Sequence, residues 1–253
     1  MSQYAVDVQN FSFWYGQFQA IKDLNFGINA NEISALIGPS GCGKSTLLKC
    51  FNRITERNPQ VSHKGTIKVF DQDIYDAQVA LPELRKKVGM VFQKPNPLPL
   101  TVKENVLFGV NVHEDHLPKF EHDEILFRAL SKVRLWEKLK DRLDDPALGL
   151  SLELQQRLCI ARLLPLKPSL ILMDEPCSAL DPAGIEAVEN LLKELKKEYT
   201  IIIVTHSMAQ AKRVSDKTLF MYMGELVEMG ETQKVFNNPD QEKTRFYIEG
   251  RFG

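Results

Sequence analysis

The 253-residue chain lacks the usual marks of secreted and membrane-spanning proteins. Its four cysteines, Cys42, Cys50, Cys159 and Cys177, show no paired ligand spacing, which favours reduced thiols over disulfides or a zinc site. No stretch approaches the roughly 18 apolar residues of a membrane span, and residues 1–10 have no signal-peptide pattern. We therefore expect a soluble, cytoplasmic chain.

An excess of either charge is also missing. The 32 Lys and Arg residues and 33 Asp and Glu residues give a formal net charge of -1, which offers no basic surface for nucleic acid. The short basic run Arg85, Lys86 and Lys87 is interpreted as a solvated helix face. With 43% hydrophobic and 26% charged residues, the composition is that of an ordinary globular domain, and we expect no nucleic-acid partner.

The most informative feature is a glycine-rich segment between a strand-like run, Ile33–Ile37, and a helix-like run, Leu47–Arg53. Glycines let the backbone turn so that its N–H groups face phosphate oxygens at the N-terminal end of the helix. Lysine would reach the β- and γ-phosphates, and the serine hydroxyl would complete a Mg²⁺ shell. We predict that ATP or a related triphosphate binds with Mg²⁺ through Gly38, Pro39, Ser40, Gly41, Cys42, Gly43, Lys44, Ser45 and Thr46.

The order of the other segments predicts an α/β fold with a P-loop NTPase (RecA-like) core. Apolar runs at 170–173 and 199–204 are typical of buried parallel strands, and a helix is expected between them at 183–197. Segments 4–15 and 65–69 indicate an N-terminal antiparallel β subdomain, and 219–223 with 225–229 a late hairpin.

Between about residues 95 and 164 strand signals fade, and helices are predicted at 123–140 and 151–164. Pro165 is expected to end the second helix near Leu164. We therefore predict a single domain, 1–253. Its nucleotide-binding core with the β subdomain comprises 1–94 and 165–253, and its inserted helical subdomain comprises 95–164.

Two carboxylates follow the apolar run at 170–173. Asp174 is assigned to the metal ion and Glu175 to the base that faces the attacking water. His206 follows the next strand and would reach the γ-phosphate at the same sheet edge. Acidic residues also end many strands and a lone histidine is usually structural, so these assignments depend on the whole group.

With Gln93 after the run Val88–Phe92, the segment 178–181 after the acidic pair, and His206, the chain resembles the ATPase subunits of ABC transporters along its whole length. Four longer strings are similar to the ATP-binding subunits of bacterial phosphate importers, namely 90–95, 177–182, 220–226 and 250–253.

The resemblance implies further site residues. Tyr15 would stack on adenine. Phe11, Phe13 and Trp14 lie close to it in the sequence, and only the resemblance to the family singles out Tyr15 among these aromatic residues. Gln93 would contact Mg²⁺ or water and sense the membrane subunits, and Asp181 would line a dimer interface.

The resemblance also implies partners. These are integral membrane permease subunits, a second ATPase subunit in a homodimer or heterodimer, and indirectly a periplasmic or extracellular solute-binding protein. The expected location is cytoplasmic, peripheral on the inner face of the cell membrane.

One departure from the family pattern stands out. The family signature is Leu-Ser-Gly-Gly-Gln, and this chain has Leu150, Ser151, Leu152, Glu153 and Leu154. We expect the helix to form, because leucine and glutamate favour helix over glycine. A Glu153 charge about 5 Å from a phosphate would cost roughly 3 kcal/mol at an effective dielectric near 20, or about a hundredfold in closure. Ser151 and the helix N-terminus would recover part of this.

The leading interpretation is the ATP-hydrolysing motor subunit of an ABC importer, with inorganic phosphate as the solute that the resemblance implies. The alternative is a regulatory or degenerate-site subunit that needs a partner with an intact signature. It also stays open that the altered signature is a tolerated variation that leaves the ATPase cycle intact. A soluble ABC-type ATPase that acts on DNA or ribosomes is disfavoured by the near-neutral net charge and the lack of a coiled-coil insertion.

Overall fold

The computed structural model describes residues 4–113 and 118–251, so the last two residues of the string 250–253 lie outside it. A four-stranded antiparallel sheet has the order β2-β1-β4-β5, and a six-stranded sheet has the order β10-β9-β3-β8-β7-β6. The first sheet comprises β1 (Val6–Tyr15), β2 (Phe18–Ile28), β4 (Val61–Val69) and β5 (Gln72–Asp73). The second comprises β3 (Ile33–Ile37), β6 (Val88–Val91), β7 (Leu170–Asp174), β8 (Thr200–Val204), β9 (Lys217–Tyr222) and β10 (Glu225–Glu231).

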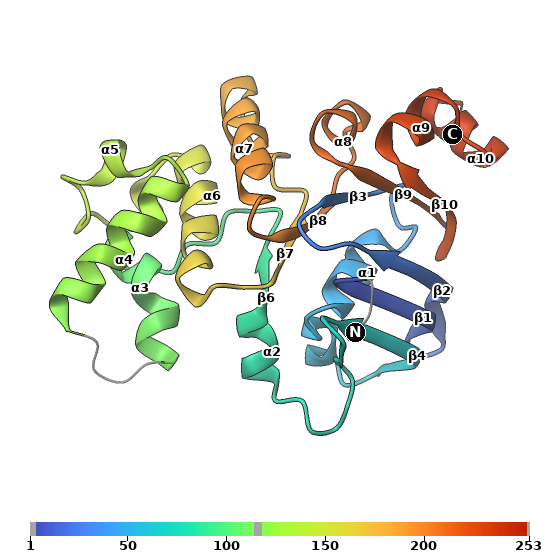
Figure 1. The fold of residues 1–253 in the computed structure, drawn as a ribbon, viewed down its shortest axis with the longest axis horizontal. Coiled ribbons are helices and arrows are strands. Elements are labelled where there is room, and N and C mark those ends of the chain that lie inside the picture. Colours follow the sequence, from blue (N-terminus) through green and yellow to red (C-terminus); the bar gives the residue numbers. More distant parts are fainter. Residues whose placement is uncertain (1–3, 114–117, 252–253) are drawn as a thin grey trace.

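Helices and the four-stranded sheet flank the six-stranded sheet (Figure 1). They are α1 (Lys44–Cys50), α2 (Leu81–Lys87), α3 (Val102–His113), α4 (Lys119–Lys132), α5 (Trp136–Leu139), α6 (Leu152–Ala161), α7 (Pro182–Leu195), α8 (Met208–Val214), α9 (Thr232–Asn237) and α10 (Glu242–Ile248). Short 3-10 turns lie at Ile54–Arg57, Ala147–Gly149 and Leu164–Leu166.

Both faces of the six-stranded sheet are buried, which explains the continuous apolar runs in its strands. Ile171 and Met173 join a core shared with α7 and the helices α3 to α6. Leu170 and Leu172 join a second core, shared with α1 and the antiparallel sheet. Successive side chains of a strand point to opposite faces, so one apolar run supplies both cores. The predicted α/β class is confirmed.

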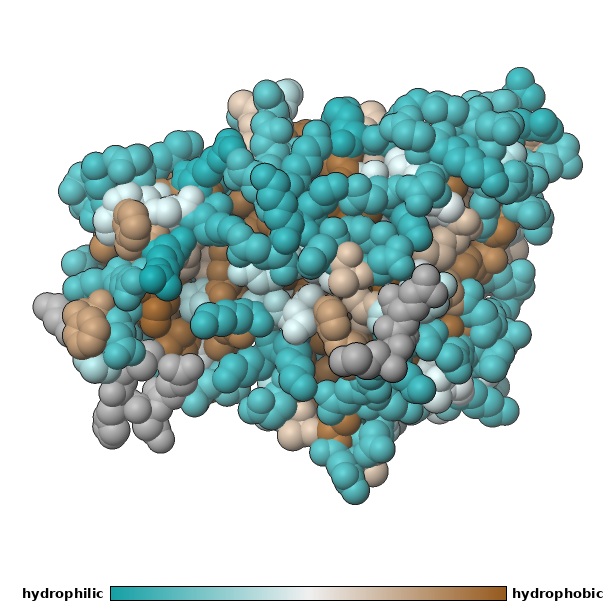
Figure 2. Space-filling model, viewed as in Figure 1, coloured by the Kyte–Doolittle hydropathy of each residue, from teal (hydrophilic) through white to brown (hydrophobic). Residues whose placement is uncertain are grey.

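Helices α3 to α6 gather at one end of the molecule and the strands β1, β2 and β4 at the other (Figure 1). These helices fall within the expected insertion at 95–164, whose boundaries stay a prediction. Figure 2 shows hydrophilic side chains over most of one face, with hydrophobic ones exposed between them. None of the helices in the two described ranges is long and apolar enough to cross a membrane.

Several predicted boundaries are wrong for local reasons. The helix expected at 123–140 is interrupted, because Arg134 adopts a left-handed φ of 57° between α4 and α5. The helix expected at 151–164 ends at Ala161, before Pro165 in the turn Leu164–Leu166. The helix expected at Leu47–Arg53 begins earlier, at Lys44, and ends at Cys50, before the left-handed Arg53.

The basic run at the end of α2 is not wholly solvated either. Arg85 turns inward and donates to the backbone oxygens of Asn52 and Arg53 at 3.3 and 3.2 Å. The late hairpin does form, with Met223 and Gly224 at positive φ in the two-residue turn between β9 and β10.

Candidate functional site

The glycine-rich segment forms a tight loop between β3 and α1. Gly38 has a φ of 148°, and a Cβ atom there would lie 2.2 Å from the backbone oxygen of Met221. A Cβ atom at Gly43 would lie 2.9 Å from the backbone oxygen of Ala20. The loop is therefore held against β9 and β2 at a distance that no side chain allows.

Lys44 is the first residue of α1, and its side chain folds back into the loop. Its Nζ donates to the backbone oxygens of Gly38 at 2.7 Å and Pro39 at 2.8 Å, and the residue is 4% exposed. Burial raises the pKa of the neighbouring Cys42 thiol above its usual range, although the Lys44 charge opposes this. Cys42 therefore stays protonated beside the lysine.

Asp174 lies at the C-terminal end of β7 and faces α1. The Ser45 hydroxyl donates to its Oδ1 at 2.8 Å, and Lys49 Nζ lies 3.5 Å from its Oδ2. A hydroxyl beside a carboxylate is a donor set that suits Mg²⁺, which takes one or two protein oxygens together with phosphates and water. No cluster of three or more His, Cys, Asp and Glu residues that could hold a metal ion occurs in the described part of the chain. The predicted residues therefore fit a hard cation that shares its shell with a ligand.

Glu175 is held by residues from two neighbouring strand ends. His206 Nε2 lies 2.8 Å from its Oε1, and Gln93 Nε2 donates to its Oε2 at 3.0 Å. Its backbone has a φ of 48°, a left-handed conformation that costs a non-glycine residue about 1–3 kcal/mol. The three predicted catalytic residues thus meet at the edge formed by the carboxyl ends of β6, β7 and β8.

Gln93 contacts Glu175 in this geometry rather than Ser45 or Asp174. Its assignment as a metal ligand therefore stays a prediction, as do the roles of the other site residues. Lys49 is a residue that sequence reasoning missed. It follows Ser45 by four positions on α1, so the helical spacing already placed both side chains on the face toward Asp174.

Tyr15 ends β1, and the structure separates it from the aromatic residues around it. Phe11 and Phe13 are 0% and 1% exposed and belong to the core, whereas Trp14 and Tyr15 are partly exposed. The Tyr15 ring meets Phe13 edge-on, with ring centroids 5.1 Å apart, and Lys64 lies over Trp14. Among the aromatics of the strand, only Trp14 and Tyr15 can offer a face to a ligand.

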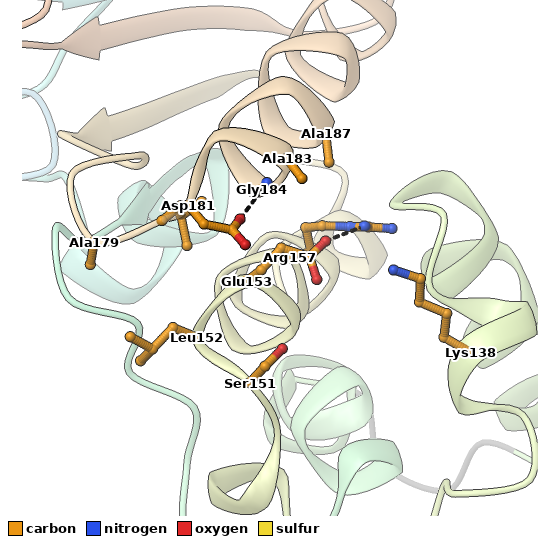
Figure 3. A pocket seen from close by; sticks show the side chains of 11 residues that line it. Lys138, Ser151, Leu152, Glu153, Arg157, Ala179, Asp181, Ala183, Gly184 and Ala187 are labelled. Carbon is orange, nitrogen blue, oxygen red and sulfur yellow. Dashed lines mark hydrogen bonds and ion pairs between the residues drawn. The ribbon is translucent and has the colours of Figure 1, made fainter.

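Ser151 and Asp181 cap the helices α6 and α7. The Ser151 hydroxyl accepts from the Leu154 N–H at 3.5 Å, and the Asp181 carboxylate accepts from the Gly184 N–H at 2.8 Å. Both residues line one pocket of about 460 Å³ (Figure 3). Their side chains stabilise the helix starts that meet at this pocket.

Part of the altered segment 152–154 lines the same pocket. Glu153 forms an ion pair with Arg157, one turn along α6 (Figure 3). Its side chain also packs against Gly184 at the start of α7, where an added Cβ atom would lie 3.2 Å from the Glu153 Cγ. Arg157 is 4% exposed and also donates to the backbone oxygens of Val133 and Arg134. This ion pair would reduce the expected repulsion between Glu153 and a phosphate, and that repulsion stays a prediction.

Leu152 is left as the exposed residue at the tip of α6. It is 51% exposed, and its side chain points away from the Glu153–Arg157 pair (Figure 3). The tip thus presents a bulky apolar side chain at the position of the first signature glycine.

A family model described as "ABC transporter" matches residues 21–178. The chain is 51% identical over 247 residues to the phosphate import ATP-binding protein PstB of Bacillus cereus, covering 98% of this chain and 91% of that protein. The proteins of the same name from Bacillus thuringiensis subsp. konkukian and Bacillus anthracis match equally well, at 51% identity over 98% of this chain and 91% of each of those proteins.

Two solved structures share the fold. CbiO1 from Clostridium perfringens, part of an ABC transporter complex, gives a TM-score of 0.82 at 29% identity, covering 99% of this chain and 96% of that one. The ATP-binding cassette MJ0796, a dimer bound to ADP and Pi after hydrolysis, gives a TM-score of 0.74 at 28% identity, covering 90% of this chain and 98% of that one.

Proposed function

The chain belongs to the ABC transporter family of ATP-binding proteins, and we propose that it hydrolyses ATP to drive the import of inorganic phosphate. The observation that carries this proposal is the meeting of Gln93, Glu175 and His206 beside the loop that holds Lys44. Phosphate as the solute rests on the likeness to the phosphate import proteins.

Each site residue then has one chemical task. Lys44 exchanges its loop carbonyl partners for the β- and γ-phosphates, and Glu175 accepts a proton from the attacking water. His206 and Gln93 hold the Glu175 carboxylate in place. Ser45 and Asp174 would hold Mg²⁺, whose charge would offset that of the phosphates.

The proposed membrane partner is a permease subunit that docks on α3. Phe108 and Val112 lie one turn apart on this helix and are 44% and 62% exposed. Buried Asn105, on the same helix, bonds both the N–H and the carbonyl of Leu98 at 2.7 and 3.1 Å. A displacement of α3 by the permease would therefore be transmitted to the segment that follows Gln93. Docking on a permease would also place the chain on the inner face of the cell membrane.

The proposed function is tested in proteoliposomes that hold the chain with phosphate permease subunits and a phosphate-binding protein. We expect uptake of radiolabelled phosphate that requires internal MgATP. Equal stimulation of ATP hydrolysis by phosphate and sulfate, without phosphate uptake, would overturn the choice of solute.

Replacing Lys44 by Ala is expected to weaken MgATP binding about tenfold to a hundredfold, because charge-assisted hydrogen bonds contribute about 1.5–3 kcal/mol. Isothermal titration of MgATP into the isolated chain measures this. Lys193→Ala, at an exposed position on α7, is the matched control and should leave the affinity unchanged. Equal affinities for both variants would remove Lys44 from the nucleotide site.

The second candidate function is a subunit whose own signature closes poorly, and Leu152 at the tip of α6 favours it. In an asymmetric heterodimer, one ATP site would combine Lys44 and Glu175 with the glycines of the partner. The other site would use Leu152 and turn over slowly. ATP turnover in the assembled complex separates this subunit from an ordinary motor.

A further inference from the structure

His206 reaches Glu175 from the short turn between β8 and α8 (Figure 1). Its Nε2 atom lies 2.8 Å from Glu175 Oε1, and 44% of its side chain is exposed. The Glu175 N–H donates to the carbonyl of Val204, the last residue of β8, at 2.9 Å. The backbone of Glu175 is thus fixed to β8, whereas its contact with the half-exposed imidazole depends on how the turn carries His206.

The two residues that flank His206 are bonded to each other and to Gln210. The Ser207 N–H donates to Thr205 Oγ1 at 3.0 Å. The Thr205 hydroxyl donates to Gln210 Oε1 at 2.7 Å, and the Gln210 N–H donates to Ser207 Oγ at 3.2 Å. These three hydrogen bonds close a ring at the turn, and Thr205 takes part in two of them.

The ring is anchored in the interior of the protein. Thr205 and Gln210 are each 3% exposed, which keeps water from competing for the hydrogen bond between them. Both residues line one pocket of about 290 Å³ together with Glu175 and His206. The buried bond therefore joins the end of β8 to the first turn of α8 directly beside the catalytic carboxylate.

We propose that Thr205 is a positioning residue for His206, and that its bonds with Ser207 and Gln210 hold the imidazole on Glu175. The inference rests on the proposed function, in which His206 keeps the Glu175 carboxylate in place. Thr205 acts through His206 and does not contact the nucleotide. Its loss therefore affects the chemical step and not the binding of MgATP.

Replacing Thr205 by Val keeps the shape of the side chain and removes only the hydroxyl. We expect kcat for ATP hydrolysis by the assembled complex to fall about tenfold, because two hydrogen bonds of the ring are lost. The KM for ATP, and the Kd for MgATP of the isolated chain, should stay within about twofold. Thr205→Ser retains the hydroxyl and should restore most of the parent kcat.

Thr218→Val is the matched control. Thr218 is 0% exposed in β9, and its hydroxyl lies 2.9 Å from that of Thr232. The control thus removes another buried, hydrogen-bonded hydroxyl, in a strand that β3 separates from β8. It should retain the parent kcat, and thermal unfolding of both variants shows whether they fold equally well.

A double-mutant cycle tests whether Thr205 acts through His206. In a His206→Ala background, Thr205→Val should cause no further loss of kcat, because two residues that act through one contact are not additive. A general loss of structure would lower kcat by the same factor in both backgrounds.

A parent-like kcat for Thr205→Val, an equal further loss in the His206→Ala background, or an equal loss for Thr218→Val would each overturn the positioning role. If Lys44→Ala weakens MgATP binding and Thr205→Val keeps the parent kcat, only this inference fails. An unchanged MgATP affinity of Lys44→Ala would overturn the proposed function, and this inference with it.

Discussion

Replacing Glu175 by Gln is expected to lower ATP turnover by about a hundredfold to ten-thousandfold, the usual contribution of a general base. An amide of the same size cannot accept the proton of the attacking water. It can still accept a hydrogen bond from His206 or Gln93, the two groups that now hold the carboxylate. Phosphate release by the assembled complex measures the loss, and MgATP affinity of the isolated chain should stay within twofold.

Glu198→Gln is the control for this variant, because Glu198 lies at the opposite edge of the sheet and pairs with Lys132. It should retain the turnover of the parent complex. Full turnover by Glu175→Gln would remove Glu175 as the base and leave His206 as the next candidate.

Because the Glu175→Gln variant should bind MgATP without hydrolysing it, it can also show which second subunit the chain pairs with. Solution mass is measured with MgATP for the chain alone and for the chain mixed with a family member that has an intact signature. A dimer of the chain alone favours an ordinary homodimeric motor, and a dimer only in the mixture favours the asymmetric heterodimer.

Restoring the signature with Leu152→Gly, Glu153→Gly and Leu154→Gln is expected to raise the ATPase activity of a homodimer about tenfold to a hundredfold. Without the Leu152 side chain, backbone N–H groups can approach the phosphates of the other subunit, and each charged hydrogen bond contributes about 1.5–3 kcal/mol. Thermal unfolding is measured alongside, because each glycine in a helix interior costs about 1 kcal/mol. No gain in activity would mean that the altered signature does not limit turnover.

Single variants separate the effect of the Leu152 side-chain volume on ATPase activity from that of the Glu153 charge. Leu152→Gly should supply most of the gain, because Leu152 is the exposed side chain at the tip. Glu153→Gln keeps the size of the side chain and should change activity little, because Arg157 already holds the carboxylate. A gain from Glu153→Gln equal to that of the triple variant would show that its charge reaches the nucleotide in the closed dimer.

The ion pair between Glu153 and Arg157 could have been predicted from the sequence. Glutamate four residues before arginine is a favourable pair on a helix, and Arg157 stands at that spacing. Treating Glu153 as an isolated charge ignored this neighbour. The backbone oxygens of Val133 and Arg134, which complete the shell of Arg157, depend on tertiary packing that no local pattern contains.

The main strands were predictable because burial on both faces leaves long apolar runs, as in β7 and β8. Strand β2 was missed, because its register to β1 shifts several times and breaks the alternation of apolar and polar residues. Helix α3 was also missed, although Val102, Val106 and Val110 repeat every four residues and are buried. Valine favours strands, so its propensity opposed the helical spacing.

The site was predictable where each residue follows a strand, as Asp174, Glu175 and His206 do, because parallel strands end at one edge. The stacking of Tyr247 on Phe220 was not, since it depends on the path of α10, which no local pattern contains.

The acceptors of Arg157 come from two places, since Glu153 lies in α6 while Val133 and Arg134 lie in the segment that follows α4. Arg157 is buried, and parting it from the backbone oxygens of Val133 and Arg134 would leave buried guanidinium N–H groups without acceptors, at a cost of about 1–3 kcal/mol for each. The Arg157 bonds therefore resist a tilt of α6 relative to α4, and we expect the two helices to move as one unit.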